Sequence, residues 1–439
     1  MIEQHSATAP AVQSTKLTRR GKKAIVAGVV GNTVEWLDWT LYATLASIFA
    51  PLFFPPGNDT AALLFALAVF AVGFVMRPIG AMVLGPYADK YGRKKGLVLT
   101  IGMMAGSSIV IGVTPSYEHI GIFAPIILVV ARLIQGFSAG GEFGSSSAYL
   151  VESAAPKRRA FAGSWQQASV GLGVLTASGM GAIITSTMSP EAVTSWGWRL
   201  AFVLAGLFGL AGLWLRSTAE ETETFERAAE ADAAKEAPRR SAVFAMFAEH
   251  PRATARVFGI TIAGTLLYYL WMSYLPVYVS VNYDIPLSRA LTANVIALTA
   301  FIVCLPFAGI VSDKLGRKPT MSFFAAGFVV FSWPAFHFLN GEFWNLLIIE
   351  LIGAFFLLGY SANAAVIMSE QFPVSIRATG IGVPYALAVA VFGGTAPYVI
   401  TWFRSNELQN YIWIYCMCAA AVGLFVYLTM PETAGKELD

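Results

Sequence analysis

The feature that most constrains this chain is a succession of long apolar stretches separated by short polar segments. Most stretches are close to the ~20 residues that an α-helix needs to cross a bilayer. Only 13% of the residues are charged, against roughly a quarter in a soluble domain, so there is too little polar surface for a body surrounded by water. The sequence therefore predicts an all-α membrane protein with twelve transmembrane helices. We expect these spans at 24–54, 61–86, 96–114, 121–150, 160–187, 198–215, 254–281, 290–311, 319–339, 343–368, 378–403 and 409–430.

The longest polar segment predicts how the spans are grouped. Residues 216–253 are rich in Glu, Ala, Lys and Arg and have no broad apolar face, so we interpret them as a cytoplasmic linker. This linker separates a bundle of six helices at 24–215 from a second bundle of six at 254–430, with tails at 1–23 and 431–439. The N-terminal tail is polar and lacks the apolar core of a signal peptide, so we expect no cleavable signal.

The placement of lysine and arginine predicts the orientation. With the N-terminus in the cytoplasm, 24 of the 29 Lys and Arg residues fall in segments on that side and only Arg199, Arg289 and Arg404 on the outer side, while Arg77 and Arg132 lie within spans. Cytoplasmic loops typically carry such an excess of positive charge. We therefore expect a multi-pass protein of the cell inner (plasma) membrane with both termini in the cytoplasm.

One loop sequence occurs twice, as GPYADKYGRK at 85–94 and as GIVSDKLGRK at 309–318. The first copy follows the second predicted span, and the other follows the eighth, which is the second span of its own half. Many secondary transporters are built from duplicated helical halves. The repeat therefore supports two related halves, and it selects as gating candidates Gly85, Asp89, Arg93, Gly309, Asp313 and Arg317.

Five further segments carry a resemblance: GNTVEWLDW at 31–39, RPIG at 77–80, RLIQGFSAGGE at 132–142, SWGWR at 195–199 and FPVSIRATG at 372–380. Together with the duplicated loop, they resemble the major facilitator superfamily and, within it, the metabolite:proton symporter family. The resemblance covers nearly the whole chain. It implies the major facilitator fold and proton-coupled transport of solutes such as 2-oxoglutarate, citrate, shikimate, proline or betaine.

Two carboxylates fall about midway along the first predicted span, where lipid makes a charge costly. Glu35 and Asp38 are three residues apart and Tyr42 follows at the next turn, so all three share one helical face. Ionisable residues inside a membrane are functional candidates by default, and we interpret one of the two carboxyls as a proton carrier. The alternative is a permanent salt bridge between helices. The resemblance assigns Arg132 to proton coupling, and Glu142, ten residues further on, is a separate candidate.

Arg77 is the main reason to expect an anionic solute. It lies eight residues before the end of the second span, roughly 12 Å inside it, and a guanidinium matches a carboxylate with two hydrogen bonds. The alternative is that its side chain extends along the helix to the membrane interface.

Other polar side chains within spans are weaker candidates for solute contact. Aromatic residues there often only pack or form an interfacial belt. We expect Glu350 and Asn363, both embedded in the tenth span, to line the cavity without an assigned role. The remaining candidates for solute binding are Tyr42, Gln166, Gln167, Tyr268 and Tyr269.

The duplicated loops are expected to form a cytoplasmic gate. An aspartate such as Asp89 or Asp313 at the end of one helix can accept hydrogen bonds from the first amides of a neighbouring helix, where the dipole favours negative charge. Arg93 and Arg317 can pair with acids of the same bundle. Such contacts would close the cytoplasmic face and break when it opens. The alternative is an ordinary solvated turn.

The leading hypothesis is a secondary active transporter that carries a small organic acid, such as a di- or tricarboxylate, together with protons by alternating access. The alternative within the same class is proton-coupled uptake of a zwitterionic osmolyte such as proline or betaine. The partners expected are a small organic solute, protons and the lipid bilayer. We expect a monomer that binds no nucleic acid.

A membrane enzyme or a solute sensor is the alternative from another class. His5, His119, His250 and His337 show no metal-ligand spacing, and no nucleotide-binding loop of the GxxxxGK[ST] type occurs. The linker and tails are too short for a signalling domain. We therefore expect no enzymatic activity, no metal site and no cofactor.

Overall fold

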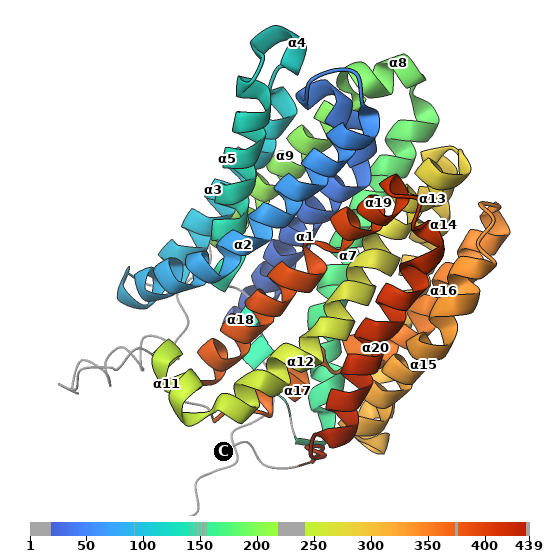
Figure 1. Cartoon of the computed structure of the whole chain (residues 1–439). Helices are drawn as coiled ribbons and strands as arrows, with labels where there is room; N and C mark the ends of the chain where they lie inside the picture. The colour runs from blue at the N-terminus through green and yellow to red at the C-terminus, as the bar shows by residue number, and fades with distance from the viewer. Residues whose placement is uncertain are drawn as a thin grey trace, which may run out of the picture.

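The computed structural model describes residues 19–91, 93–141, 143–144, 147–148, 151, 154, 156–217, 242–373 and 376–435. These residues form helices joined by short turns, and no strand occurs among them. The elements before residue 218, here called the N-terminal helices (Figure 1), are α1 (Arg19–Phe53), α2 (Asp59–Tyr91), α3 (Arg93–Val113), α4 (Tyr117–Ile120), α5 (Phe123–Ser138), η1 (Ala139–Gly141), η2 (Pro156–Arg158), α7 (Arg159–Thr187), α8 (Pro190–Ala192), η3 (Val193–Gly197) and α9 (Trp198–Ser217).

The elements after residue 241 are the C-terminal helices, which lie beside the first set in Figure 1. We call the end of the molecule that holds α4 and α8 the upper end, and the end that holds α11 and α17 the lower end. The C-terminal helices are α11 (Ala242–Glu249), α12 (Pro251–Tyr268), η4 (Tyr269–Tyr274), α13 (Leu275–Tyr283), α14 (Leu287–Leu315), α15 (Arg317–His337), α16 (Phe343–Ser361), α17 (Ala364–Ser369), α18 (Arg377–Ala388), η6 (Val389–Gly393), α19 (Ala396–Ser405), η7 (Gln409–Tyr411) and α20 (Ile412–Thr429).

The helices have the length and composition of membrane spans. Among the described residues, nine helical stretches are long and apolar enough to cross a membrane, and Val98–Val113 and Phe123–Ser138 are shorter apolar helices. The 35 residues of α1 also suffice. The predicted all-α membrane fold is confirmed, whereas the count of twelve crossing helices stays a prediction.

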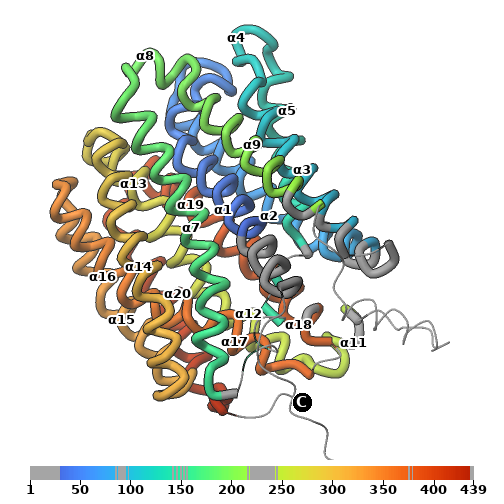
Figure 2. The backbone as a smooth tube through the Cα atoms, turned by 180° about the vertical axis from the view of Figure 1, so that it is seen from behind, coloured from blue at the N-terminus to red at the C-terminus, as the bar shows by residue number. Residues whose placement is uncertain are grey.

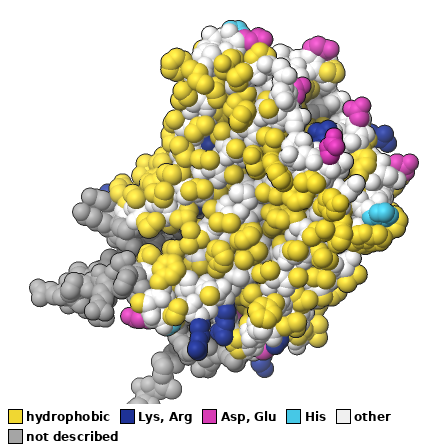
Figure 3. Space-filling view, viewed as in Figure 1, with side chains coloured by type: hydrophobic (Ala, Val, Ile, Leu, Met, Phe, Trp, Pro, Cys, Tyr) yellow, Lys and Arg dark blue, Asp and Glu magenta, His cyan; other side chains and the backbone are white. Residues whose placement is uncertain are grey.

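The outer surface agrees with this assignment. Apolar side chains cover most of the face seen in Figure 3, and charged side chains gather toward its two ends. Large exposed apolar residues lie on many helices, such as Phe65, Phe208, Val330 and Phe425. Because lipid replaces water around such a surface, these residues need no partner inside the protein.

The two sets of helices meet along α7 and α14, which run side by side in Figure 2. Glycines make this approach possible. A Cβ on Gly171 would lie 2.8 Å from Ile302, and one on Gly309 would lie 2.8 Å from the carbonyl oxygen of Ala160. Small residues at such positions let helix backbones come close where water provides no hydrophobic driving force.

Helices α2 and α5 pack still more closely. A Cβ on Gly136 would lie 1.7 Å from the carbonyl oxygen of Gly73, and one on Gly140 would lie 2.1 Å from that of Arg77. The fourth predicted span, 121–150, is not a single regular helix, because α5 ends at Ser138 and continues as η1. This contact fixes Arg77 and Arg132, which lie on these two helices, close to α1.

Two C-terminal spans contain a π-helical segment, a feature that often occurs at functional sites. In the seventh predicted span, η4 (Tyr269–Tyr274) interrupts the α-helix directly after Tyr268. In the eleventh, η6 (Val389–Gly393) follows α18. Both segments pack toward the N-terminal helices, η4 against α1 and η6 against α2.

Candidate functional site

The first charged pair joins α1 to α2. Arg77 Nη2 donates a hydrogen bond to Glu35 Oε1 at 3.0 Å, and both side chains are buried. The guanidinium carbon of Arg77 lies 4.6 Å from the ring centres of Trp39 and Phe74. Its side chain is thus directed into the bundle, toward a carboxylate and aromatic rings, and not along the helix to the interface.

The second charged pair lies within the N-terminal helices. Arg132 Nη1 on α5 donates to Asp38 Oδ2 on α1 at 3.3 Å and to Gln135 Oε1 at 2.7 Å. Ser108 on α3 donates to the other oxygen of Asp38, and Gln135 Nε2 donates to Ser108 Oγ at 3.1 Å. Each carboxylate of α1 therefore has its own arginine. Removing one member of such a buried pair typically costs about 3–5 kcal/mol.

Aromatic rings surround both arginines. Trp39 lies between them, with its ring centre 4.6 Å from the guanidinium of Arg77 and 4.9 Å from that of Arg132. The ring of Tyr42 lies 3.8 Å from the Arg132 guanidinium, and its hydroxyl donates to the carbonyl oxygen of Ala66 at 2.9 Å. Tyr42, predicted to bind solute, here contacts Arg132 and is not among the residues that line the cavity between the two sets of helices.

A small cavity lies between the N-terminal and the C-terminal helices. Its volume is about 10 Å³, room for about one water molecule, so this conformation is closed around the pathway. Of the predicted solute ligands, Gln167, Tyr268 and Tyr269 are in its wall, whereas Gln166 is buried on α7 outside it. The wall consists of Trp36, Gln167, Val170, Thr265, Tyr268, Tyr269, Tyr360 and Tyr385.

The cavity wall contains polar atoms that lack a partner. The hydroxyls of Thr265, Tyr268 and Tyr269 are buried and make no hydrogen bond within the described part of the chain. A buried hydroxyl without a partner is costly, so these groups are suited to bind a polar ligand. The guanidinium carbon of Arg77 lies 5.9 Å from the ring centre of Trp36, a wall residue, so the first pair lies directly behind the cavity wall.

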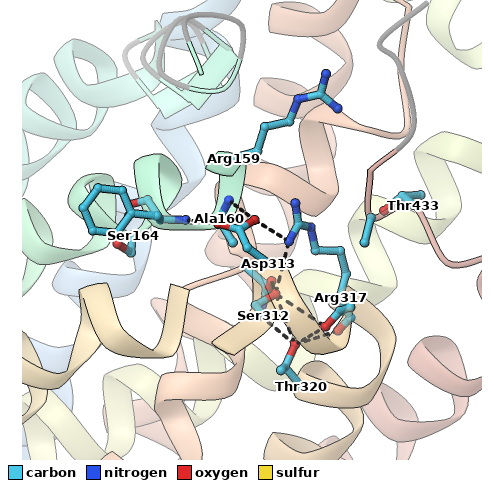
Figure 4. Close-up of polar contacts among 12 residues, drawn as sticks. Arg159, Ala160, Ser164, Ser312, Asp313, Arg317, Thr320 and Thr433 are labelled. Atoms are coloured by element: carbon cyan, nitrogen blue, oxygen red, sulfur yellow. Dashed lines mark hydrogen bonds and ion pairs between the residues drawn. The ribbon is translucent and has the colours of Figure 1, made fainter. Parts of the chain in front are cut away.

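The second copy of the duplicated loop joins the two sets of helices at the lower end. Asp313 on α14 accepts hydrogen bonds from the backbone N–H groups of Ala160 and Phe161, each at 3.0 Å (Figure 4). These amides open α7, where they have no acceptor within the helix and the dipole favours an anion. Arg317 Nη1 donates to Asp313 at 2.9 Å and orients it.

Glu370, which we did not predict, completes this charged cluster. Its Oε1 lies 3.6 Å from Arg317 and 3.8 Å from Arg159, so one carboxylate lies near arginines from both sets of helices. Its other oxygen accepts a hydrogen bond from Thr433 after the last helix. The sequence signal was an acid two residues before the 372–380 segment, but its partners are more than 50 residues away.

The chain after α20 also contacts the start of α15. Glu432 accepts hydrogen bonds from the backbone N–H groups of Arg317 and Lys318, each at 3.0 Å. Partial burial raises the pKa of Glu432, but these two donors and the N–H groups of Thr433 and Ala434 outweigh it and hold the pKa below its ordinary value. The carboxylate therefore stabilises the first turn of α15.

Some candidates lie elsewhere or outside the described residues. Glu142 falls outside them, and so do the surroundings of Gly85, Asp89 and Arg93. Asn363 is hydrogen-bonded to Ser312 and Thr320 at the lower end, and Glu350 is bonded to Asn294; neither lines the cavity in this conformation. Among the described residues, no group of three or more His, Cys, Asp and Glu side chains is arranged to hold a metal ion.

Tyr360 and Tyr385 were also missed by the sequence analysis, although both line the cavity. Each is a tyrosine in an apolar span, and the sequence does not distinguish these from tyrosines that only pack. Ser108 and Gln135 were missed for the same reason, because a serine or glutamine in a span gives no indication of a nearby carboxylate.

Sequence comparison defines the class of protein that this fold and site represent. The profile of the sugar (and other) transporter family matches residues 23–439, and the chain belongs to this family. It is 35% identical over 441 residues to the alpha-ketoglutarate permease of Escherichia coli K12, with 99% of each chain covered. It is 33% identical to the glycine betaine/proline/ectoine/pipecolic acid transporter OusA of Dickeya dadantii, over 95% of this chain and 85% of that one.

Solved structures share the fold. The partially occluded inward-open structure of the xylose transporter XylE from E. coli aligns with a TM-score of 0.70 at 20% sequence identity, covering 95% of this chain and 99% of that one. The predicted major facilitator fold is thus confirmed. The protein is a multi-pass membrane transporter of small solutes and not an enzyme.

Proposed function

We propose that this transporter is a proton-coupled symporter of a small organic acid, a di- or tricarboxylate or a related metabolite. The observation that carries the proposal is the Arg77–Glu35 pair, whose guanidinium lies 5.9 Å from the ring of the wall residue Trp36. While Glu35 is ionised, it occupies Arg77. Protonation of Glu35 leaves the guanidinium without its counter-ion, and a carboxylate of the solute then provides one with two hydrogen bonds. Proton and anion therefore favour each other's binding.

The Asp38–Arg132 pair supplies a proton site away from the solute. Asp38 is buried among N-terminal helices and is hydrogen-bonded by Arg132 and Ser108. Trp39 lies against both arginines, so a shift of Arg132 on protonation of Asp38 displaces a side chain that contacts Arg77. This coupling through a shared aromatic ring links the proton to the solute site.

We propose alternating access between the halves 24–215 and 254–430 as the transport motion. The α7–α14 contact and the Asp313 hydrogen bonds to α7 form the gate at the lower end, which opens when these bonds break. The lower end faces the cytoplasm in this proposal, because it carries Lys157, Arg158, Lys314 and Lys318 whereas the upper end carries few cations. The transporter acts as a monomer in the bilayer.

A zwitterionic osmolyte is the second candidate solute, and the composition of the cavity wall favours it. Five of the eight wall residues are aromatic, and aromatic faces attract quaternary ammonium groups. The relative OusA is named for glycine betaine and proline among its solutes, whereas the permease of E. coli is named for alpha-ketoglutarate. The two candidates differ in net charge, and this difference makes them separable.

Uptake by purified protein in proteoliposomes tests both candidates. An inward proton gradient is imposed, and accumulation of labelled 2-oxoglutarate, proline and glycine betaine is measured separately, each in competition with unlabelled citrate, succinate, proline and glycine betaine. We expect accumulation above equilibrium, competition by the carboxylic acids, and collapse of the gradient-driven part with a protonophore. Accumulation of only betaine or proline would select the second candidate. Accumulation that persists after the proton gradient is removed would contradict proton coupling.

A further inference from the structure

A third acidic side chain is buried in the membrane part of the bundle, and the mechanism above does not use it. Glu350 lies seven residues into α16, roughly 10 Å from its upper end, and its side chain has no exposed surface. Its Oε1 accepts a long hydrogen bond of 3.4 Å from Asn294 Nδ2 on α14, and its Oε2 has no hydrogen-bond partner within the described residues.

The hydrogen bonds of Asn294 continue to the N-terminal helices. Asn294 Oδ1 accepts from Ser178 Oγ on α7 at 2.8 Å. Ser178 and Asn294 are both fully buried at the α7–α14 contact. The carboxyl of Glu350 is therefore joined through one amide to a helix of the opposite half, and the Ser178–Asn294 bond requires α7 and α14 to be in contact.

Within the described part of the chain, no cation forms an ion pair with Glu350. Helix α16 packs against α12, η4, α14, α15 and α17, and no described residue of these elements or of α7 forms an ion pair with it. Arg289 and His337 are exposed at the upper end. Other charged groups of these helices lie at the lower end. On α14 and α7, Asp313, Lys314 and Arg159 are 19 or more residues from Asn294 or Ser178, and Arg317, Lys318, Arg252 and Arg256 lie at the starts of α15 and α12. The tyrosines of the packed elements are Tyr268, Tyr269 and Tyr274.

An ionised carboxylate in such a place is strongly disfavoured. A buried charge without a partner becomes neutral instead of remaining ionised, and a single neutral amide does not replace a cation. The contrast with Glu35 and Asp38 is direct, because each of those carboxylates has an arginine within 3.3 Å. A protonated carboxyl also fits the contacts, since one oxygen accepts from Asn294 and the other carries the proton.

We propose that Glu350 is a further proton-binding site, occupied while α7 and α14 are closed and emptied when their separation admits water. On closing, the carboxylate takes one proton from water; on opening, the Ser178–Asn294 bond breaks and the proton returns to water. This proposal rests on the proposed proton-coupled cycle for its role in transport. The existence of the site does not depend on that role, because protonation of Glu350 can be measured without measuring transport.

Infrared spectroscopy of the full chain reconstituted in lipid tests the site. The carbonyl-stretch band of protonated carboxyls is recorded at pH 7 for wild type, Glu350→Gln and the control Glu342→Gln, which changes an exposed glutamate at the start of the same helix. We expect Glu350→Gln to lose the intensity of one protonated carboxyl and Glu342→Gln to lose none. If Glu350→Gln does not fold, Glu350→Asp must shift the band instead. An identical band in wild type and the folded Glu350 variant overturns the proposal.

The link to the α7–α14 contact has its own test. Ser178→Ala removes the hydroxyl that bonds Asn294 while leaving Glu350 in place. We expect the Glu350 band to disappear at a lower pH in this variant, because the closed state is weakened; an unchanged titration overturns the link. If uptake proves independent of protons while the band remains, the proposed function fails and the proton site stands.

Discussion

Arg132 donates a hydrogen bond to Asp38 over 3.3 Å, at a point where neither residue is in contact with solvent. The arginine comes from α5 and the carboxylate from α1, so both partners belong to the N-terminal helices. The other pair, Arg77 and Glu35, is linked to tyrosines of the C-terminal helices through Trp36, whose ring lies 5.9 Å from the Arg77 guanidinium and contacts Tyr268 and Tyr269. We infer a division of tasks, in which the Asp38–Arg132 pair binds a proton away from the solute and the Arg77–Glu35 pair meets the solute.

Arg77→Ala should weaken uptake of an organic acid more than about tenfold in KM, because charge-assisted hydrogen bonds contribute ~1.5–3 kcal/mol. The variant also leaves Glu35 buried without its arginine. The double variant Arg77→Ala, Glu35→Gln removes that charge and serves as the folding control. Initial uptake rates over a range of 2-oxoglutarate concentrations provide the measurement. An unchanged KM in folded protein would remove Arg77 from the solute site.

Asp313→Asn should open the lower end more often. The amide retains one acceptor for the α7 amides but loses the charge that the helix start favours, a change of ~1 kcal/mol. After replacement of Cys304, Cys416 and Cys418 by serine, the alkylation rate of Ser164→Cys, buried near this contact, reports opening.

We expect alkylation about fivefold faster in Asp313→Asn, the factor that corresponds to ~1 kcal/mol. The matched control is Asp284→Asn, because Asp284 is exposed in a left-handed backbone conformation that asparagine also adopts. Equal alkylation rates in the two variants would show that Asp313 does not hold the gate closed.

Glu432→Gln should destabilise the protein in a pH-dependent way. The folded-state pKa of Glu432 lies below its ordinary value of 4.5, so the stabilisation by the carboxylate is complete above that pH and disappears as pH falls through the folded-state pKa. Solvent screening keeps it below ~1 kcal/mol. Thermal unfolding in detergent should show a lower midpoint for the variant at pH 7 and a smaller difference from wild type below pH 4.5.

The control for this measurement is Glu407→Gln, which changes an exposed glutamate at the upper end. It should match wild type at neutral pH. A Glu432→Gln protein with the wild-type midpoint at pH 7 would show that the contact with α15 contributes nothing to stability.

Gly136→Ala should prevent or severely impair folding. The added Cβ would lie 1.7 Å from a backbone oxygen of Gly73, and backbone atoms of a packed helix cannot move aside without separating α2 from α5. Gly106→Ala is the matched control, because its Cβ would meet nothing within 4 Å and alanine favours a helix by ~1 kcal/mol over glycine. Yields of monodisperse protein compare the two; comparable yields would contradict the close α2–α5 packing.

The sequence predicted the residues of this transporter better than their partners. Apolar length and the low share of charged residues were enough for the membrane class, since these are properties of each segment alone. The duplicated loop singled out Asp313, but the amides of Ala160 and Phe161 that it binds belong to a helix about 150 residues earlier. Such contacts depend on how the halves pack, which no local pattern records.

The cavity wall is a second case in which the sequence predicted only some of the residues that lie together. Tyr268 and Tyr269 were predicted as solute ligands and lie in its wall together with Tyr360 and Tyr385, which were not. A π-helical segment begins at Tyr269 and changes which side chains share a face. The sequence analysis assumed a regular α-helical period throughout the span, and that period does not predict the change.

The most direct test of the account is transport by Asp38→Asn, because Asp38 is the proposed proton site that does not touch the solute. Solute exchange and pH-gradient-driven accumulation are measured in the same proteoliposomes, with Asp59→Asn, a change at an exposed aspartate that opens α2, as the control. We expect Asp38→Asn to exchange solute across the membrane but to accumulate none, whereas Asp59→Asn does both. Accumulation by folded Asp38→Asn at the wild-type level would contradict the account.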